Sequence, residues 1–428
     1  MKRDIYKQLL AWKNEKEHKP LILNGARQVG KTYILREFGR NEYKRMAFFS
    51  LDRDQKALEI FNKGGRATDM LMALSAICHE DITPHDTLVV LDEIQNCPKA
   101  LEALKFFCEE TPEIDIVVAG SLLGLSIHSG VSYPVGKVEE LHLYPMTFLE
   151  FLEAMGKTQL VNLLENKNWT VINMLETELI SSLRQYYYVG GMPAAVLAHI
   201  EKKGWKEVRR IQQQIITDYR RDFSKHAPTR EIPRINMVWD SIPAQLAKEN
   251  KKFVYGAVKK SARAADFEMA IQWLIDAGLA YKVPRVNAPR LPLKFYEDIS
   301  AFKLFMLDVG LMGAMAETTA ESVVVGDNIF SEYKGAFTEL YVFTQLKALG
   351  YSLYYHAVDN STIEIDFLTQ RDNQVIPIEV KAEVNVKAKS LRTFISNNPE
   401  LKGIRFSMLP YKEQDWMTNI PLYACMAW

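Results

Sequence analysis

The sequence predicts a multidomain α/β protein, and three observations support this prediction. The chain has 428 residues, a length that corresponds to about three domains at about 150 residues each. Apolar residues make up 48% of the chain and charged residues 25%, close to the averages of folded globular proteins. Its first half contains several short apolar runs of the kind that a parallel sheet buries on both faces. We therefore expect several packed cores rather than a disordered or fibrous chain.

The charge balance excludes a chain-wide electrostatic attraction to nucleic acid or anionic lipid. Lys plus Arg and Asp plus Glu both number 53, so the formal net charge is zero. Binding to either partner would therefore require a local basic patch.

Cysteine usage, the charged N-terminal residues and the interrupted uncharged stretch indicate a cytoplasmic protein without a membrane segment. The four cysteines are far apart and form no CxxC pair, which argues against a disulfide framework or a zinc site. Residues 1–19 are charged throughout and suit an amphipathic helix rather than a signal peptide. Residues 116–136 lack charges, but glycines and a proline interrupt them, unlike a membrane helix.

A glycine-rich loop predicts a nucleotide-binding site near the start of the chain. The apolar run 20–24 has strand length, and it is followed by GARQVGKT and then by a helical pattern. Gly25, Gly30, Lys31 and Thr32 meet the pattern GxxxxGK[ST]. In such a P-loop, backbone N–H groups surround the phosphates, the lysine reaches the β- and γ-phosphates and the hydroxyl binds Mg²⁺. The sequence thus predicts an ATP and magnesium site on a P-loop NTPase parallel sheet.

Two further strand ends carry polar residues that suit the same site. The apolar strand 87–91 is followed by Asp92, which would hold Mg²⁺, and by Glu93, which would orient the attacking water. The plainer interpretation of these two acids is the start of a polar loop. After the strand 114–119, Ser121 is placed to sense the γ-phosphate, although a serine after glycine also serves as a turn or a helix cap.

The strings GARQVGKT, LDEIQ, AGSLLG and LYPMTFLEFL together resemble a family of prokaryotic AAA+-type ATPases, and the resemblance covers nearly the whole chain. It implies an ATPase domain over residues 1–150, a helical lid over 151–230 and a C-terminal domain of unknown function, in a chain that could form a homo-oligomer. The family commonly has Gly-Arg where this chain has Gly136 and Lys137. If that arginine acts across a subunit boundary, Lys137 is a poorer substitute, because an ammonium lacks the planar fork of donors.

The lid segment contains two features with open interpretations. By its resemblance to the lids of related signalling ATPases, the GGMP step at 190–193 implies that Pro193 lies near the adenine; structurally, it is also a simple helix break. Arg220 and Arg221 would contact a phosphate as arginine-finger equivalents, or would form a solvated basic helix end.

Residues 231–300 have the outline of a winged-helix-like module. Three helices are expected before two extended segments at 279–286 and 291–296. The third helix, 264–277, has acidic residues on its outer face, which oppose entry into a DNA groove. A packing or oligomerisation role is therefore favoured over contact with the DNA backbone. Basic residues gather just before this helix: Lys251, Lys252, Lys259, Lys260 and Arg263.

Residues 301–428 predict an α/β domain with a constellation of acids and a lysine. Glu339 lies in an expected helix over 328–349, and Asp366 lies on a strand that begins a hairpin. Glu379 and Lys381 share a face of the return strand. The set resembles the restriction-endonuclease-type metal site, which implies that the carboxylates hold a second Mg²⁺ and that Lys381 stabilises charge on an attacked phosphate or helps to orient the water. Alternatively, the fold is retained and these residues form salt bridges, or the domain is an inactive nucleic-acid binder.

Two hypotheses for the whole chain follow. In the first, the chain is an Mg²⁺-dependent ATPase whose nucleotide state controls a nuclease-like C-terminal site that acts on DNA. In the second, it is an ATP-switched regulator or assembly protein whose inactive C-terminal domain binds a protein partner.

Overall fold

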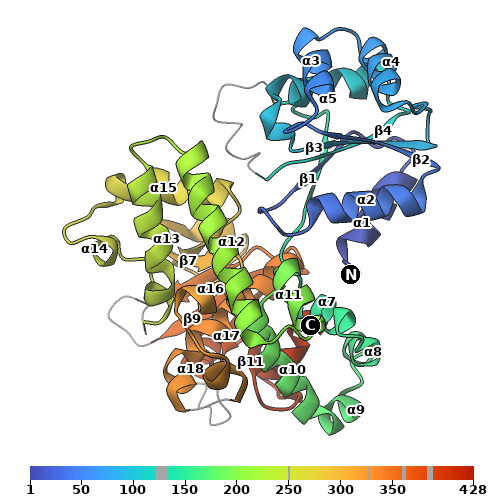
Figure 1. Cartoon of the computed structure of the whole chain (residues 1–428). Coiled ribbons are helices and arrows are strands. Elements are labelled where there is room, and N and C mark those ends of the chain that lie inside the picture. The colour runs from blue at the N-terminus through green and yellow to red at the C-terminus, as the bar shows by residue number, and fades with distance from the viewer. Residues whose placement is uncertain (122–132, 249–250, 326–327, 359–362, 383–388) are drawn as a thin grey trace. The chain divides into compact units, whose positions relative to one another are not determined.

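The computed structural model of the chain describes residues 1–121, 133–248, 251–325, 328–358, 363–382 and 389–428 (Figure 1). These residues form two compact units. We call residues 2–144 with 276–279 the N-terminal unit, and residue 1 with 145–275 and 280–428 the C-terminal unit. Within the described parts of the chain, no helix has the length and apolar character needed to span a membrane.

The N-terminal unit is built on a five-stranded sheet in which every pair of neighbours is parallel. Every residue of the strands Thr87–Asp92 and Asp115–Ala119 is buried, as expected for apolar runs covered on both faces. The three strands expected around 20–24, 87–91 and 114–119 are thereby confirmed. The strand order is β2 (Arg45–Ser50), β3 (Thr87–Asp92), β4 (Asp115–Ala119), β1 (Leu21–Asn24) and β5 (Glu139–His142).

Helices cover both faces of this sheet (Figure 1). On one face lie α1 (Ile5–Asn14) and α2 (Lys31–Glu42). On the other lie α3 (Gln55–Lys63), α4 (Ala67–Cys78) and α5 (Pro98–Glu110). The side of the sheet covered by α3–α5 holds a buried apolar core. Its aromatic members come from one strand and two helices: Phe49, Phe61 and Phe107. This apolar packing fixes the positions of the strand ends.

The C-terminal unit begins with a helical region, in agreement with the periodicity of residues 151–230. Aromatic rings join this region to the last third of the chain. The ring centroid of Phe148 lies 5.7 Å from that of Tyr186 and 6.2 Å from that of Tyr341. The helices are α7 (Phe148–Ala154), α8 (Thr158–Glu165), α9 (Trp169–Met174), α10 (Glu176–Val189), α11 (Pro193–Ile200), α12 (Trp205–His226), α13 (Ile232–Leu246), α14 (Tyr255–Val258), α15 (Ala264–Asp276), α16 (Val309–Met315), α17 (Asn328–Ala348) and α18 (Lys389–Asn397).

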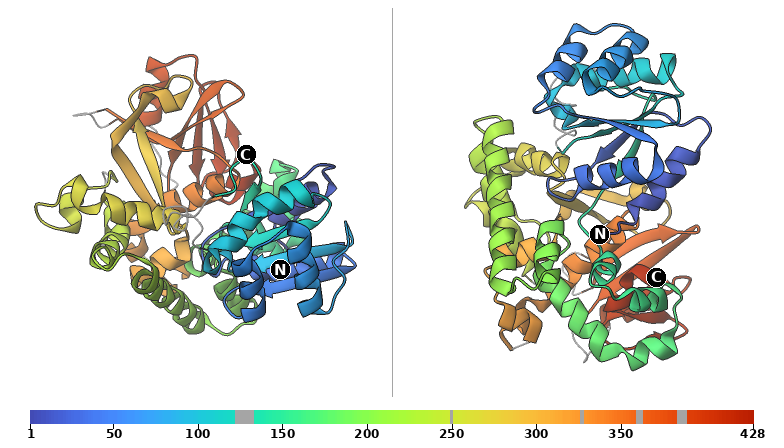
Figure 2. Two further views of the ribbon diagram at one scale, coloured as in Figure 1. Left: turned by 90° about the horizontal axis from the view of Figure 1, so that it is seen from above. Right: turned by 45° about the vertical axis from the view of Figure 1, so that its right-hand side comes forward.

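An eight-stranded mixed sheet completes the C-terminal unit, and Figure 2 shows this sheet and the long helix α12 from two further sides. The hairpin expected in the last domain is present: two of the strands pair antiparallel with Gln374 opposite Arg371. The strand order is β12 (Lys412–Glu413), β13 (Met417–Pro421), β11 (Gly403–Ser407), β10 (Gln374–Val380), β9 (Glu364–Arg371), β8 (Tyr354–Ala357), β6 (Ala280–Val286) and β7 (Glu297–Met306).

One expected strand is absent from its predicted position. Residues Leu293–Tyr296 form a short 3₁₀ helix, and the partner of β6 is β7, which begins only at Glu297. Pro289 and Pro292 lack a backbone N–H, so neither can donate a ladder hydrogen bond, which disfavours a strand at this position.

The units also divide the chain differently from the four expected domains. The junction at 144/145 lies close to the expected boundary at 150, but those at 230 and 300 lie within the C-terminal unit. The boundary expected at 300 falls inside β7. Both β6 and β7 belong to the same sheet as the C-terminal strands. Val286 and Leu293 share a hydrophobic core with Ile365 and Phe394.

Candidate functional site

The glycine-rich loop joins the end of β1 to the start of α2, as a P-loop must. Gly30 is the N-cap of α2 and has φ of +100°, in the left-handed region. Gly25 has φ of +149°, and a Cβ there would lie 2.4 Å from the backbone oxygen of Leu143. Both positions therefore require glycine, which explains the two glycines of the sequence pattern in physical terms.

Lys31 is buried and turned into this loop. Its Nζ donates hydrogen bonds to the backbone oxygens of Gly25 and Ala26, each at 2.8 Å. Burial lowers the pKa of Lys31 to about 8, although the nearby Glu93 and Asp92 carboxylates favour its charged form. The loop thus holds an ammonium group whose hydrogen-bond partners are weak neutral acceptors.

Thr32 and Asp92 connect the loop to the acidic end of β3. The Thr32 hydroxyl donates to Asp92 Oδ2 at 2.7 Å, and the backbone N–H of Glu93 donates to Asp92 Oδ1 at 3.1 Å. Asp92 is buried, and this burial raises its pKa. A hydroxyl beside a carboxylate is a set of hard oxygen ligands, so these residues fit the Mg²⁺ ion that the loop pattern implies.

Glu93 occupies a sharp turn directly after the strand. Its φ is +56°, which is uncommon for a residue with a side chain. Its Oε2 accepts a hydrogen bond from Gln95 Nε2. The charge of Glu93 acts on the Lys31 ammonium, so the two side chains face a common region at the carboxyl end of the sheet.

Ser121 is brought to the same region because β4 lies between β1 and β3. Its hydroxyl accepts a hydrogen bond from Arg27 Nε at 3.2 Å. Arg27 is a loop residue that the sequence pattern leaves unspecified, and our sequence reasoning missed it; its positive charge within GARQVGKT was the available signal. The rest of the AGSLLG string and most of the stretch 116–136 lie outside the described residues.

The other residues predicted for the nucleotide site have acidic neighbours. In the N-terminal unit, Lys137 Nζ lies 2.9 Å from Glu109 Oε1. In the C-terminal unit, Arg221 Nη1 lies 3.1 Å from Asp218 Oδ1. Their roles as arginine-finger equivalents stay predictions.

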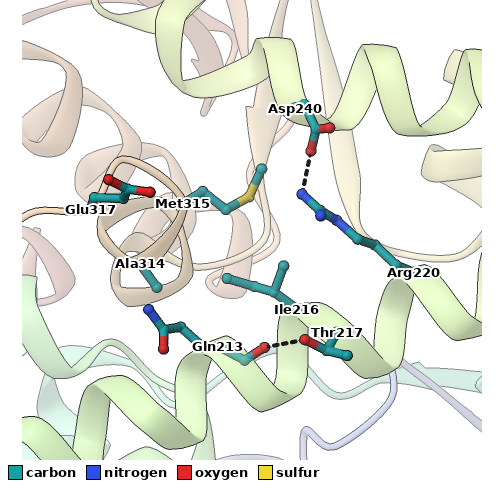
Figure 3. Close-up of a pocket in the computed structure, with 8 residues that line it drawn as sticks. All are labelled: Gln213, Ile216, Thr217, Arg220, Asp240, Ala314, Met315 and Glu317. Atoms are coloured by element: carbon teal, nitrogen blue, oxygen red, sulfur yellow. Dashed lines mark hydrogen bonds and ion pairs between the residues drawn. The ribbon is translucent and has the colours of Figure 1, made fainter.

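Arg220 lines a cavity of about 320 Å³ in the C-terminal unit, together with residues of α12, α13 and the end of α16 (Figure 3). Its Nη2 lies 2.7 Å from Asp240 Oδ1, so this pair links α12 to α13. Both side chains are about half exposed, so this pair is a solvated contact of small energetic value.

The GGMP step packs against the segment that contains Asp308. Pro193 is the first residue of α11, where proline suits a helix start. The Gly191 N–H donates to Asp308 Oδ2 at 2.6 Å, and a Cβ on Gly190 would lie 2.3 Å from Asp308 Oδ1. The glycines therefore permit a close approach within the C-terminal unit, and contact of Pro193 with adenine stays a prediction.

The C-terminal constellation does come together, but Glu339 is paired with two lysines that we did not predict. Its Oε1 lies 2.9 Å from Lys303 Nζ, and its Oε2 contacts Lys251 Nζ. Lys303 also lies 2.7 Å from Glu364 Oε1. Burial alone would raise the pKa of Glu339, but the two ammonium groups outweigh it and hold the pKa below its usual value. A lysine inside the apolar strand sequence FKLFM was the signal that could have identified Lys303.

The remaining members are close enough for their charges to interact. Burial and the Glu339 carboxylate raise the pKa of Asp366, whose Oδ2 accepts the Val380 N–H at 2.7 Å. Lys381 Nζ lies 3.0 Å from Glu379 Oε1. Over the described residues, however, no group of three or more acidic, histidine or cysteine side chains is arranged to hold a metal ion. With both oxygens of Glu339 taken by ammonium groups, the predicted ligands Glu339, Asp366 and Glu379 do not fit a second Mg²⁺ in this conformation.

Family models match three parts of the chain. The AAA domain matches the sheet and loop described above, and this match supports ATP binding and hydrolysis by a P-loop ATPase fold. The two other matches are domains of unknown function and attach no activity to the C-terminal unit. The matched residues are 17–152 for the AAA domain, 180–322 for the domain of unknown function DUF8612 and 334–424 for the domain of unknown function DUF4143.

Several solved structures are distantly similar to this chain. The Walker-type ATPase PABY2304 of Pyrococcus abyssi is 13% identical, with 74% of this chain and 95% of that chain covered and a TM-score of 0.46. AMPPCP-bound DnaA from Aquifex aeolicus is 14% identical, with 64% and 86% covered and a TM-score of 0.28. Cdc6p from Pyrobaculum aerophilum is 12% identical, with 76% and 96% covered and a TM-score of 0.26. These TM-scores are too low to carry an argument about function, and a comparison with curated proteins finds no match.

Proposed function

We propose that the chain is an Mg²⁺-dependent ATPase whose nucleotide state controls its C-terminal unit. The observation that carries the proposal is the 2.7 Å hydrogen bond from Thr32 Oγ1 to Asp92 Oδ2. This bond joins a P-loop hydroxyl to the acidic end of the buried strand β3, and the two oxygens are of the kind that a phosphate-bound magnesium ion takes as ligands. When bound, that ion would neutralise charge on the phosphates.

The residues of the loop would bind the phosphates. Gly25 and Gly30 let the backbone N–H groups approach them, and the N-terminus of α2 adds a favourable dipole. Lys31 would exchange its two carbonyl partners for phosphate oxygens, because an anionic acceptor forms a stronger hydrogen bond with an ammonium than a neutral carbonyl does.

Two residues would act on the transferred group. Glu93 would orient the attacking water and accept its proton, and Ser121 would sense the γ-phosphate. Support for the second role comes from the hydrogen bond between Ser121 and Arg27, which links this residue to the loop.

Substitution of Lys31 and Glu93 tests the proposal. We expect Lys31→Ala to weaken ATP binding by about 100-fold or more, because a charge-assisted contact is lost. Glu93→Gln should retain ATP binding but lower turnover by about 100-fold or more, the range for a lost general base. Lys44→Ala is a matched control, since the Lys44 side chain is 74% exposed and pairs with Asp86 on the surface. Equal turnover in Glu93→Gln and the parent protein would remove Glu93 from its role.

For the C-terminal unit, the pairing of Glu339 with Lys251 and Lys303 favours a partner-binding role over cleavage of DNA. We propose that this unit binds a protein partner in an ATP-dependent manner, and the nuclease-like reading remains the second candidate. A partner retained with ATP in both the parent and Asp366→Ala would support the first role. Mg²⁺-dependent nicking of DNA that is lost in Asp366→Ala, and turnover of ATP that DNA accelerates, would support the second.

A further inference from the structure

The glycine-rich loop contains a second cationic side chain, that of Arg27, at a position that the loop pattern does not specify. The next residue, Gln28, has φ of +66°, which is uncommon for a residue with a side chain. Left-handed residues in such a loop turn successive backbone N–H groups toward a common concave face, which suits an anion. The Arg27 side chain is partly buried, so it packs beside this loop instead of extending into solvent.

The strand register places Ser121 beside the start of the loop. Ala119, the last residue of β4, pairs in parallel with Leu23 of β1. The chain therefore leaves the two strands side by side, toward Ser121 in one case and Gly25 in the other. Ser121 is buried, and its hydroxyl accepts the hydrogen bond from Arg27 Nε at 3.2 Å. This bond holds the Arg27 guanidinium over the end of β4.

The end of β4 also borders the acidic end of β3, which carries Asp92 and Glu93. A guanidinium over β4 therefore lies between the phosphate-binding loop and the residue proposed to orient the attacking water. The γ-phosphate has to occupy this region, since the water must reach its phosphorus in line with the leaving oxygen.

The two cations of the loop lie near each other. Lys31 Nζ donates to the backbone oxygens of Gly25 and Ala26, the two residues directly before Arg27. Burial lowers the pKa of Lys31, and the positive charge of Arg27 lowers it further. Like charges at short range are unfavourable unless an anion lies close to both. A triphosphate supplies such an anion.

We infer that Arg27 contacts the γ-phosphate of ATP bound by the same chain and stabilises the charge of the transition state, while Ser121 positions Arg27. In the proposed hydrolysis, the water oxygen bonds to the γ-phosphorus as the bond from this phosphorus to the bridging oxygen breaks. The electron pair of that bond leaves with ADP, and Glu93 accepts a proton of the water. A planar guanidinium can donate to two phosphate oxygens at once, which an ammonium cannot.

The inference rests on the proposed ATPase function and deepens it. The charge-stabilising arginine then comes from the loop itself, and neither Lys137 nor a second subunit has to supply it.

The affinities for ATP and ADP test the contact, since only ATP has a γ-phosphate. The variants for binding carry Glu93→Gln so that ATP is not consumed, and titration calorimetry with Mg²⁺ measures both nucleotides. We expect Arg27→Ala to weaken ATP binding by about 10-fold or more and ADP binding by less than about 2-fold. Arg40→Ala is the matched control, since Arg40 is exposed in the last turn of α2, and it should change neither affinity. An equal loss for both nucleotides, or no loss, would overturn the inference.

Turnover at saturating ATP, with Glu93 intact, tests the catalytic role. Arg27→Ala should lower turnover by about 100-fold or more, because removal of an arginine from the transferred phosphoryl group has effects of at least this size. Arg27→Lys keeps the charge without the planar fork, so it should bind ATP more tightly than Arg27→Ala does and recover little turnover. Parental turnover in Arg27→Ala would contradict the inference.

Substitution of Ser121 should matter only when Arg27 is present. Ser121→Ala should lower turnover by about 10-fold with the ADP affinity unchanged, and Ser121→Thr, which keeps the hydroxyl, should retain turnover. In the Arg27→Ala background, Ser121→Ala should have no further effect. Additive losses would show that Ser121 does not act through Arg27.

The two proposals can be separated. A parent protein that neither binds nor hydrolyses ATP would overturn both. A parent that hydrolyses ATP, with an Arg27 variant that keeps the same preference for ATP over ADP, would overturn this inference alone. Melting temperatures show whether each variant folds, and Arg27→Gln, which keeps most of the stem without the charge, replaces Arg27→Ala if that variant does not fold.

Discussion

At the scale of single residues, Asp308 shows how a buried carboxylate holds two distant motifs together. Its Oδ2 accepts the Gly191 N–H at 2.6 Å, and its Oδ1 accepts the Leu311 N–H at 2.9 Å as the N-cap of α16. We expect Asp308→Ala to lower the free energy of unfolding by about 2–4 kcal/mol, because two buried N–H groups lose their acceptor. Urea unfolding followed by circular dichroism would measure this loss.

The pH dependence of the same carboxyl group provides a control. Burial raises the pKa of Asp308 to about 6, from 3.8 in an unfolded chain. Between these values the folded state binds more protons than the unfolded state, so this group makes stability fall as the pH rises from about 4 to about 6. Asp308→Asn keeps an acceptor and removes the titration. If it leaves the pH profile unchanged, the carboxyl group does not titrate in this window.

These contacts also show which residues a sequence can assign. Gly25, Gly30, Lys31 and Thr32 follow one another at a fixed spacing, and one loop explains them all. The GGMP step and Asp308 lie far apart in the chain, and each has a plausible local role as a helix break or a cap. Their contact depends on the packing of α10, α11 and α16, which no local pattern contains.

At the scale of elements, an ion pair before β1 makes the N-terminal unit sensitive to pH. His18 Nε2 lies 3.1 Å from Asp115 Oδ1 at the start of β4, and both side chains are buried. The Asp115 carboxylate raises the pKa of His18 more than burial lowers it, and the charge of Glu139 adds to the increase. A histidine whose pKa is raised in the folded state stabilises the fold fully below about pH 6.5, its pKa in the unfolded chain. This stabilisation is lost as the pH rises through the pKa of the folded state.

We therefore expect the N-terminal unit to lose stability as the pH rises above about 6.5, with a slope of at most about 1.4 kcal/mol per pH unit for one proton. Thermal unfolding from pH 5 to pH 9 measures the slope, and His18→Gln should flatten it. His85, whose Nδ1 lies 4.0 Å from the same Asp115 oxygen, is exposed, so His85→Gln is the matched control. A slope that persists in His18→Gln would show that His18 is not its source.

The sequence predicts strands best where a strand is buried on both faces and therefore has an unbroken apolar run. β3 and β4 are buried at every residue, and each was recognised from its sequence. Residues 291–296 are also mostly apolar, yet Leu293–Tyr296 form a 3₁₀ helix. An apolar run alone therefore does not identify a buried strand, because Leu293 is buried in this segment whereas Phe295 is 83% exposed.

At the scale of the whole molecule, the sequence predicts the N-terminal unit more fully than the C-terminal one. The P-loop, the acidic strand and Ser121 lie on neighbouring strands, so sheet topology alone brings them together. The C-terminal cluster draws Lys251, Lys303 and Glu339 from three separate segments. The spacing of Glu379 and Lys381 could suggest an acidic site, but not that two lysines would neutralise Glu339.

Control of the C-terminal unit by ATP predicts a change in hydrogen exchange that extends beyond the nucleotide site. Linkage requires that if ATP shifts the state of the C-terminal unit, the two states of that unit differ in their affinity for ATP. In Glu93→Gln, which should hold ATP without turnover, ATP should slow amide exchange in residues 25–32. It should also change exchange in residues 251–255 and 364–380, where Lys251 and Asp366 lie. Lys31→Ala treated with ATP is the control and should show neither change. Protection confined to residues 2–144 would mean that the N-terminal unit binds ATP without influence on the C-terminal cluster, and the proposed control would then be wrong while ATP hydrolysis would remain.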